Sequence, residues 1–282
     1  AVRGVRPAFG PLGSTAGASM VRVVCRSPKG KAASGDGVPG GPYELAVFSR
    51  PQRADEELEP NDAVRSDLPK LVVGASLQGA LSPEGDVDLY VIGSAGVAAG
   101  QAMALSATGS PDVEWELAIL DPDGPPLLVR AVAKGQAVLV PNLDLAALPP
   151  GSLVRVRSIK GQAPDTPYAL GLQPWLPTGC ARAEDCAQLV PQEREPNDLA
   201  ERPWLVAWQP AGQTVAGVLG GVGDVDQLAL QVPTGAVATL TVTAPATVGL
   251  GLHMQSDTLP AWTVSAAPGA QWSLPGVAGG PQ

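Results

Sequence analysis

Acidic motifs that occur twice are the part of this 282-residue chain best suited to chemistry. Residues 59–62 read EPND, and residues 195–198 read EPND again. A GDVD segment follows each copy, at 85–88 and at 223–226. Carboxylate and amide oxygens are the ligands that calcium takes in proteins. The four motifs are therefore two candidate cation sites built from the same residue types.

Two interpretations of these motifs stay open at the level of sequence. If the EPND loop folds beside the GDVD strand, their carboxylates crowd at the rim of a core, which is costly unless a cation compensates the charge. Alternatively, the EPND residues form a turn or cap, and the aspartates accept hydrogen bonds from backbone amides. In the first interpretation the candidate metal ligands are Glu59, Asn61, Asp62, Asp86, Asp88, Glu195, Asn197, Asp198, Asp224 and Asp226.

The alternation of side chains along a strand predicts which way the GDVD aspartates point. After the second copy, Gln227 and Gln231 lie on the face opposite to the aspartates and mark it as the wetter face. We therefore expect the aspartate face to point into the core. This inward face consists of Asp86, Asp88, Tyr90 and Ile92 in the first copy and of Asp224, Asp226, Leu228 and Leu230 in the second.

The motifs belong to longer units that repeat along the chain. WELAIL at 115–120 corresponds to VGLGLH at 248–253, and GQAVLVPNL at 135–143 corresponds to GAQWSLPGV at 269–277. Near the amino end, MVRVVC and GPYELAV match LVRVRS and TPYALGL, which close the unit around the first EPND. We predict a partial unit of closing strands at 1–50, a complete unit at 57–173, a linker with prolines and cysteines at 174–192, and a third unit without closing strands at 193–282.

Within each unit the pattern is that of β-strands. Short segments rich in Val, Leu, Ala and Thr alternate with clusters of Gly, Pro, Asn and Asp, and no helical period extends beyond two turns. DPDG at 121–124 predicts a hairpin turn rather than part of a calcium loop. The pattern predicts an all-β fold of tandem antiparallel β-sandwich domains, with strands at 71–73, 101–107, 115–120, 136–140, 153–158 and 168–172.

Composition argues against several classes of function. The chain has one histidine, His253, which we expect to be packed or at a rim, and none of the common hydrolase, metalloprotease or nucleotide-binding motifs. We therefore expect no enzyme. The net charge of 18 − 27 = −9 disfavours nucleic acids and anionic membranes. Apolar runs are too short for a membrane span and the start lacks the plan of a signal peptide, so we expect a soluble chain without membrane insertion.

In the order of its motifs the chain resembles the bacterial pre-peptidase C-terminal domain family. That order is EPND, a glycine before a short strand (Gly79, Gly217), GDVD, a DPDG-type hairpin and a closing PYxL strand, and it covers 57–173 and parts of both flanking units. The resemblance implies a jelly-roll-like, non-catalytic β-sandwich that is appended to secreted peptidases or arrayed in extracellular proteins. It also implies calcium, which some members bind through the equivalents of Glu59, Asn61, Asp62, Asp86 and Asp88. The third unit departs from the usual DxDxY of the family with Gln227 and Leu228, and we do not expect collagen as a ligand.

We therefore expect a non-catalytic, calcium-associated segment of a larger secreted or cell-surface protein, acting as a spacer, stabiliser or adhesion module. Its expected partners are neighbouring domains of a longer polypeptide and an extracellular protein or polysaccharide. One alternative is the C-terminal accessory region of a secreted peptidase. The other is a carbohydrate-binding module, which requires several of the six tryptophans to be exposed on one plane: Trp115, Trp175, Trp204, Trp208, Trp262 and Trp272.

The cysteines and the two ends of the chain carry the remaining predictions. Cys180 and Cys186 are predicted to form a disulfide, because five intervening residues close a small loop, and Cys25 is predicted to be buried and unpaired. Segments 20–25 and 42–48 have the sequence to complete the third unit, within one molecule or by exchange between two. Alternatively, each end is simply half of a unit whose other half lies outside this chain.

Overall fold

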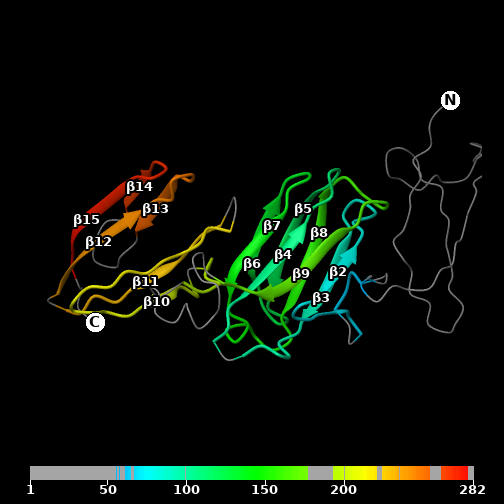
Figure 1. The fold of residues 1–282 in the computed structure, drawn as a ribbon, viewed down its shortest axis with the longest axis horizontal. Coiled ribbons are helices and arrows are strands. Elements are labelled where there is room, and N and C mark those ends of the chain that lie inside the picture. The colour runs from blue at the N-terminus through cyan, green and yellow to red at the C-terminus, as the bar shows by residue number, and fades with distance from the viewer. Residues whose placement is uncertain are drawn as a thin grey trace, which may run out of the picture.

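The chain folds into β-strands, as the sequence predicts. The computed structural model describes residues 55, 57, 61–64, 67–98, 100–176, 193–199, 201–220, 224–234, 236–254 and 262–278. Within these residues every regular element is a strand (Figure 1). No helix in this part of the chain is long and apolar enough to cross a membrane.

Residues 57–173, called the middle unit below, form two sheets that enclose one core. The first sheet has the order β1 (Lys70–Leu71), β3 (Val87–Ile92), β8 (Leu153–Lys160), β5 (Glu114–Leu120) and β6 (Pro126–Val132). The second has the order β2 (Ser76–Gly79), β9 (Tyr168–Pro174), β4 (Met103–Thr108) and β7 (Val138–Leu143). Neighbouring strands are antiparallel except β1 and β3, which run parallel. Strand β9 continues through Pro174, the first residue of the predicted linker.

Alternating apolar residues supply the core of the middle unit. In β5, Trp115, Leu117 and Ile119 are almost completely buried and meet residues of the opposite sheet such as Leu105 and Leu170. Burying a side chain of this size stabilises a fold by about 1.5–3 kcal/mol. The predicted DPDG hairpin is confirmed, because β5 and β6 pair across it and Gly124 N–H donates to the Asp121 carbonyl at 3.4 Å. Packing of this core therefore sets the relative positions of the two sheets, at whose edge the acidic motifs lie.

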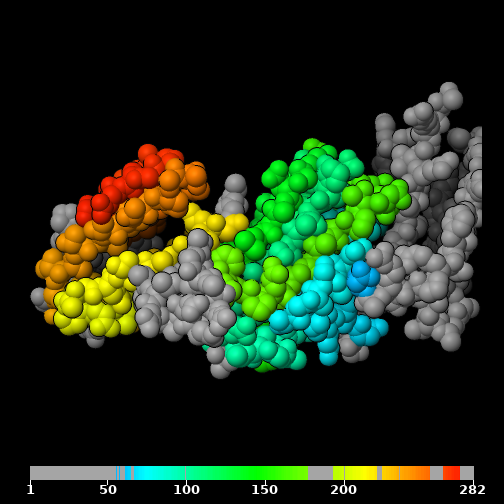
Figure 2. Space-filling model, in the orientation of Figure 1, coloured from blue at the N-terminus to red at the C-terminus, as the bar shows by residue number. Residues whose placement is uncertain are grey.

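Residues 193–282, called the third unit below, form a more open arrangement. Their strands pair two by two: β10 (Trp204–Val206) with β11 (Leu228–Leu230), β12 (Val237–Thr243) with β15 (Gln271–Ala278), and β13 (Leu250–Met254) with β14 (Trp262–Ala266). Figure 2 shows β10 and β11 in yellow and the later strands in orange and red as two bands that are separated over part of their length.

The predicted burial of Leu228 and Leu230 is wrong, since these side chains are 45% and 41% exposed. In the middle unit the matching face of β3 lies under the other sheet, and Tyr90 is completely buried. Among the described residues of the third unit, β11 pairs only with β10 and has no second neighbour in its sheet. The leucines are exposed because strands that would cover them are not among these residues.

Several predictions concern residues outside the described part of the chain. These are the partial unit at 1–50 with its segments 20–25 and 42–48, most of the predicted linker, and the cysteines Cys25, Cys180 and Cys186. The candidate ligand Glu59 also lies outside it.

Candidate functional site

A buried glutamate that precedes EPND organises the acidic site of the middle unit. Glu57 N–H donates to the Gln78 carbonyl at 3.0 Å, and Gln78 N–H donates to the Asp55 carbonyl, so this segment runs along the edge of β2. The Glu57 side chain points inward and is 1% exposed. Its Oε1 accepts the N–H of Ala80 at 2.5 Å, which ties the start of the unit to the end of β2.

Two tyrosines connect Glu57 to the GDVD strand. Tyr90 Oη donates to Glu57 Oε2 at 2.6 Å, and Tyr168 Oη donates to Asp88 Oδ2 at 2.8 Å. The two hydroxyl oxygens are 2.5 Å apart, and all four side chains are almost completely buried. Since Asp88 and Tyr90 lie on β3 and Tyr168 lies on β9, this network joins the two sheets. The predicted inward orientation of Asp88 is confirmed.

Burial raises the pKa of Glu57, and hydrogen bonds from Tyr90, Ala80 and Asn61 oppose that shift. Burial disfavours the charged form of a carboxyl group, and these donors stabilise it.

The glycine that the motif places before the short strand has a steric reason in the middle unit. A Cβ atom built on Gly79 would lie 2.4 Å from the Tyr168 ring and 2.5 Å from Glu57 Oε2. Any other residue would push the tyrosine and the glutamate apart. Gly79 is thus part of the same site as Glu57 and Tyr168.

The predicted ligands of the middle unit divide between two environments. Asn61 is completely buried, and its Nδ2 donates to Glu57 Oε2 at 3.2 Å, so it belongs to the tyrosine network together with Asp88. Asp62 is exposed. Asp86 accepts the N–H of Ser82 at 2.7 Å and that of Val87 at 3.1 Å, as the backbone-amide interpretation of the motif predicts.

The pKa of Asp86 is raised to about 6, mainly by burial, against the effect of the Ser82 N–H. The negative charges of Asp62 and Glu57 raise it further. Asp62 and Asp86 are therefore close enough to repel each other.

The corresponding residues of the third unit converge on one point. Carboxylate oxygens of Glu195, Asp198 and Asp224 lie within 4.8 Å of one another. The side chains of Glu195 and Asp224 are completely buried, and that of Asp198 is 12% exposed. Gly220 N–H donates to the carboxylate of Asp224, as Ser82 does to Asp86. Three of the five predicted ligands thus form one cluster, which could hold a metal ion.

Arg130 of the middle unit is inserted into this cluster. Its guanidinium bonds to Asp224, to both carboxylate oxygens of Asp198, and to Glu195 at 3.3 Å. Arg130 itself is 2% exposed although it lies on the edge strand β6. Burial raises the pKa of Glu195 and Asp198, and the arginine opposes that effect for both. The cation that compensates this cluster is a side chain of the neighbouring unit.

Main-chain bonds reinforce the contact between the two units. Glu195 N–H donates to the Asn142 carbonyl at 3.2 Å, and Asp144 N–H donates to the Glu195 carbonyl at 2.8 Å, so the EPND segment pairs with the end of β7. In addition, the Arg194 side chain donates from its Nη2 to the Gly100 carbonyl at 3.1 Å. The second EPND motif therefore forms a joint between the units.

A second acidic group in the third unit corresponds to the tyrosine network of the middle unit. Glu193 Oε1 accepts the N–H of Val218 at 2.8 Å, as Glu57 accepts that of Ala80. Burial raises the pKa of Glu193 to about 7 and that of Asp226 to about 6. Asn197 lies beside Asp226 and lowers the pKa of Asp226, yet neither of its amide atoms has a hydrogen bond of normal geometry within the described residues. Leu228 stands where the middle unit has Tyr90.

Three functional residues escape the sequence analysis. Glu57 and Glu193 each precede EPND by the same spacing, and this ExEPND agreement between the copies was an available signal. Arg130 has no such signal, because nothing in the hairpin sequence indicates that its side chain reaches residues 65 to 94 positions away.

The other candidate features have structural roles. Trp115 is buried, and Trp175, Trp204, Trp208 and Trp272 are half-buried, so the described tryptophans form no exposed platform. His253 is exposed, and its Nδ1 is hydrogen-bonded to Thr263.

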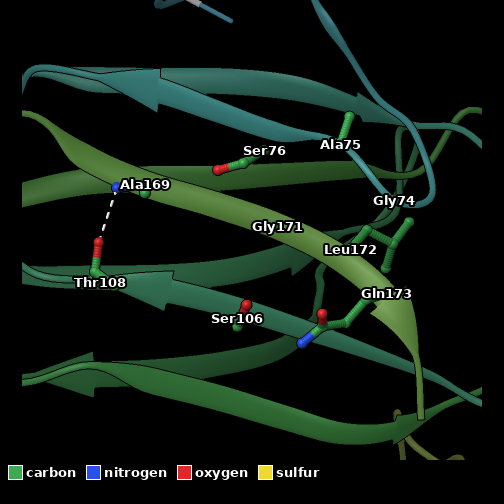
Figure 3. A pocket seen from close by; sticks show the side chains of 9 residues that line it. All are labelled: Gly74, Ala75, Ser76, Ser106, Thr108, Ala169, Gly171, Leu172 and Gln173. Atoms are coloured by element: carbon green, nitrogen blue, oxygen red, sulfur yellow. Dashed lines mark hydrogen bonds between the residues drawn. The ribbon is translucent and has the colours of Figure 1, made fainter.

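Hollows in the described surface are shallow. One of about 300 Å³ lies on the outer face of β2, β9 and β4, where small residues such as Gly171 and Ser106 leave room (Figure 3). A second, of similar volume, lies at the joint beside Asp144, Arg194 and Trp204.

A scan against protein-family models finds no matching family, and a search of curated proteins finds no match.

Proposed function

We propose that the chain is a non-catalytic β-sandwich repeat segment of a larger secreted or cell-surface protein, and that it acts as a spacer whose units are held in a set orientation. The observation that carries this proposal is Arg130, a buried cation of one unit that bonds to three carboxylates of the next. An acidic site whose carboxylates are bonded to an arginine of the neighbouring unit joins domains rather than binding a substrate.

The energetics of a buried ion cluster suit a joint. A buried ion pair offsets the cost of removing its charges from water only when its geometry is good, and removing one partner is strongly destabilising. Arg130 reaches its three carboxylates only when the middle and third units are docked. Alternative orientations would leave buried charges without partners, so one orientation is favoured.

Calcium remains part of the proposal for the middle unit. Asp62 and Asp86 repel each other at the rim of the sandwich, and a divalent cation there would relieve that repulsion. Glu59, from the same motif, would be a further ligand. In the third unit the carboxylate oxygens of Glu195, Asp198 and Asp224 lie close enough together to hold a cation, but Arg130 already compensates them. Metal and arginine cannot hold the same oxygens together.

The accessory region of a secreted peptidase would use the same joint. The full reading frame would distinguish this alternative from a spacer, because a peptidase requires a catalytic domain in the same polypeptide. The carbohydrate-binding alternative needs an exposed aromatic plane, and the described tryptophans do not support it.

A distance measurement between the units tests the spacer function. Spin labels would be attached at the exposed positions Lys134 in the middle unit and Gln209 in the third, in a chain whose three native cysteines are replaced by serine. A spacer with a set orientation gives one narrow distance distribution. Arg130→Gln should broaden it, and Arg155→Gln, which removes a partly exposed pair with Glu116 inside the middle unit, should not. A broad distribution in the parent chain would refute the proposal.

A further inference from the structure

Gly220 of the third unit lies directly against the backbone of β7 in the middle unit. A Cβ atom built on Gly220 would lie 2.5 Å from the carbonyl oxygen of Leu139 and 2.8 Å from Cδ of Pro141. Real Cβ atoms essentially never lie within 3.0 Å of such neighbours. The contact between the units at this point therefore needs a residue without a side chain.

The two neighbours of Gly220 on β7 are held in place by the middle unit. Leu139 is paired with Ser106 of β4, and the clashing atom of Leu139 belongs to the main chain. Pro141 is buried, and Val140 between them is completely buried in the core. A side chain at position 220 would therefore displace the third unit from β7, by at least the 0.5 Å that brings the contact to 3.0 Å.

The third unit by itself has no need of a glycine at this position. The φ angle of Gly220 lies outside the left-handed region, so other residues can adopt its backbone conformation. Gly220 precedes Asp224 by four residues and donates its N–H to that carboxylate, as Ser82 does to Asp86 in the middle unit. A serine thus occupies the same place in the first copy of the motif, and the requirement for glycine comes from the joint.

A displacement away from β7 would break the bonds that cross the joint. Glu195 N–H donates to the Asn142 carbonyl at 3.2 Å, and Arg130 Nη2 donates to Glu195 Oε1 at 3.3 Å. Both distances are already at the upper end of the usual range for hydrogen bonds, so a further 0.5 Å takes them out of it. Contact at Gly220 and bonding of Arg130 therefore depend on the same close approach.

We infer that Gly220 is the specificity-determining residue of the joint. It admits the second EPND motif to the edge formed by β7 and Arg130, and Ser82 excludes the first EPND motif from the same contact. The inference rests on the spacer function proposed above, and it adds the feature by which one of two identical motifs is selected. A unit that fits this edge carries EPND, GDxD and a glycine four residues before the first aspartate of GDxD.

The cysteine-free chain with spin labels at Lys134 and Gln209 tests this inference. Gly220→Ser, which introduces the residue of the first copy, should broaden or shift the narrow distance distribution. Gly220→Ala should do the same, because the clash begins at Cβ. Gly251→Ser is the matched control, since Gly251 is exposed on β13 of the same unit and its Cβ would have no atom within 4 Å. It should leave the distribution unchanged.

Hydrogen exchange of two amides provides a second readout at the joint itself. The N–H groups of Asp144 and Glu195 both donate across it, to Glu195 and Asn142 respectively. In Gly220→Ser their exchange should be faster by about tenfold or more, as expected for a local opening of the contact. Exchange in β12, which pairs with β15 inside the third unit, should equal that of the parent chain.

Each other outcome has a definite meaning. A parent-like distance distribution and parent-like exchange at Asp144 in Gly220→Ser overturn the inference and leave the spacer function intact. An equal effect of Gly251→Ser also overturns it. So does loss of protection in β12 of Gly220→Ser, because the glycine would then serve the fold of the third unit itself. A broad distribution in the parent chain refutes the spacer function instead.

Discussion

Removal of Arg130 should destabilise the third unit more than any surface ion pair can. Its side chain and those of Glu195 and Asp224 are at most 1% exposed, so these charges are protected from water and salt. Removing one partner of a buried ion cluster costs about 3–5 kcal/mol, because the remaining charges are left uncompensated. We expect a loss of that order for Arg130→Met, which keeps much of the volume of the side chain.

Peptide-level hydrogen exchange in urea measures this loss where it occurs. The middle and third units need not unfold together, and a single transition would mix them. Exchange in residues 193–199 should report the full loss, and exchange in β4 should change by less than about 1 kcal/mol. The matched control is Arg155→Met, which breaks a partly exposed pair with Glu116 at 2.7 Å and should cost at most about 1 kcal/mol.

A charge-compensating variant separates the ion cluster from simple packing. Adding Glu195→Gln and Asp198→Asn to Arg130→Met removes two of the uncompensated carboxylates and should recover at least half of the loss. If Arg130→Met costs less than about 1 kcal/mol in residues 193–199, or if the compensating changes only add to the loss, the arginine does not hold the joint.

Further predictions address the other acidic groups and the linker. Burial raises the pKa of Glu193 to about 7, so the stability that this shift contributes is present below the ordinary value of 4.5 and is lost as the pH rises through 7. Hydrogen exchange in residues 193–199, corrected for intrinsic rates, should therefore be faster at pH 8 than at pH 5. The opposite order would contradict this prediction. Tyr168→Phe should lower the urea stability of the middle unit by about 1.5–3 kcal/mol, because Asp88 loses a donor, and an unchanged midpoint would contradict that. Calcium at one hundred times its dissociation constant should stabilise the middle unit by about 2.7 kcal/mol, and a melting temperature unaffected by calcium, by chelator and by Asp86→Asn would refute the site. Protein made in an oxidising compartment should show a Cys180–Cys186 disulfide, and three alkylated thiols by intact mass would exclude it.

The strands of the middle unit could be predicted because their information is local. The hairpin at DPDG, the strand after GDVD and the inward orientation of Asp88 follow from turn residues and alternation alone. Alternation also placed Leu228 on an inward face, and that prediction failed because burial depends on what lies opposite. In β11 the opposing strands are absent from the described residues, so the face is open although its pattern is the same.

The partners of the acidic residues could not be predicted because they are distant in sequence. Tyr90 and Tyr168 are 78 positions apart, and Arg130 and Asp224 are 94 positions apart. Periodicity assigns a side chain to a face but does not say which side chains share a core or an interface. The repeated residue types predicted crowded carboxylates, and they did not indicate which side chains would bond to them.

The two copies of EPND show how the same carboxylates can be compensated in different ways. In the middle unit, tyrosine hydroxyls donate hydrogen bonds to Glu57 and Asp88. In the third unit, the adjoining unit contributes a guanidinium. Arg130 pairs with Leu117 across its hairpin, and the residue that pairs with the corresponding Leu250 of the third unit is Ala266. No lysine or arginine follows Arg202 in this sequence. Residues 203–282 therefore contain no side chain that could repeat the contact that Arg130 makes with the second EPND motif.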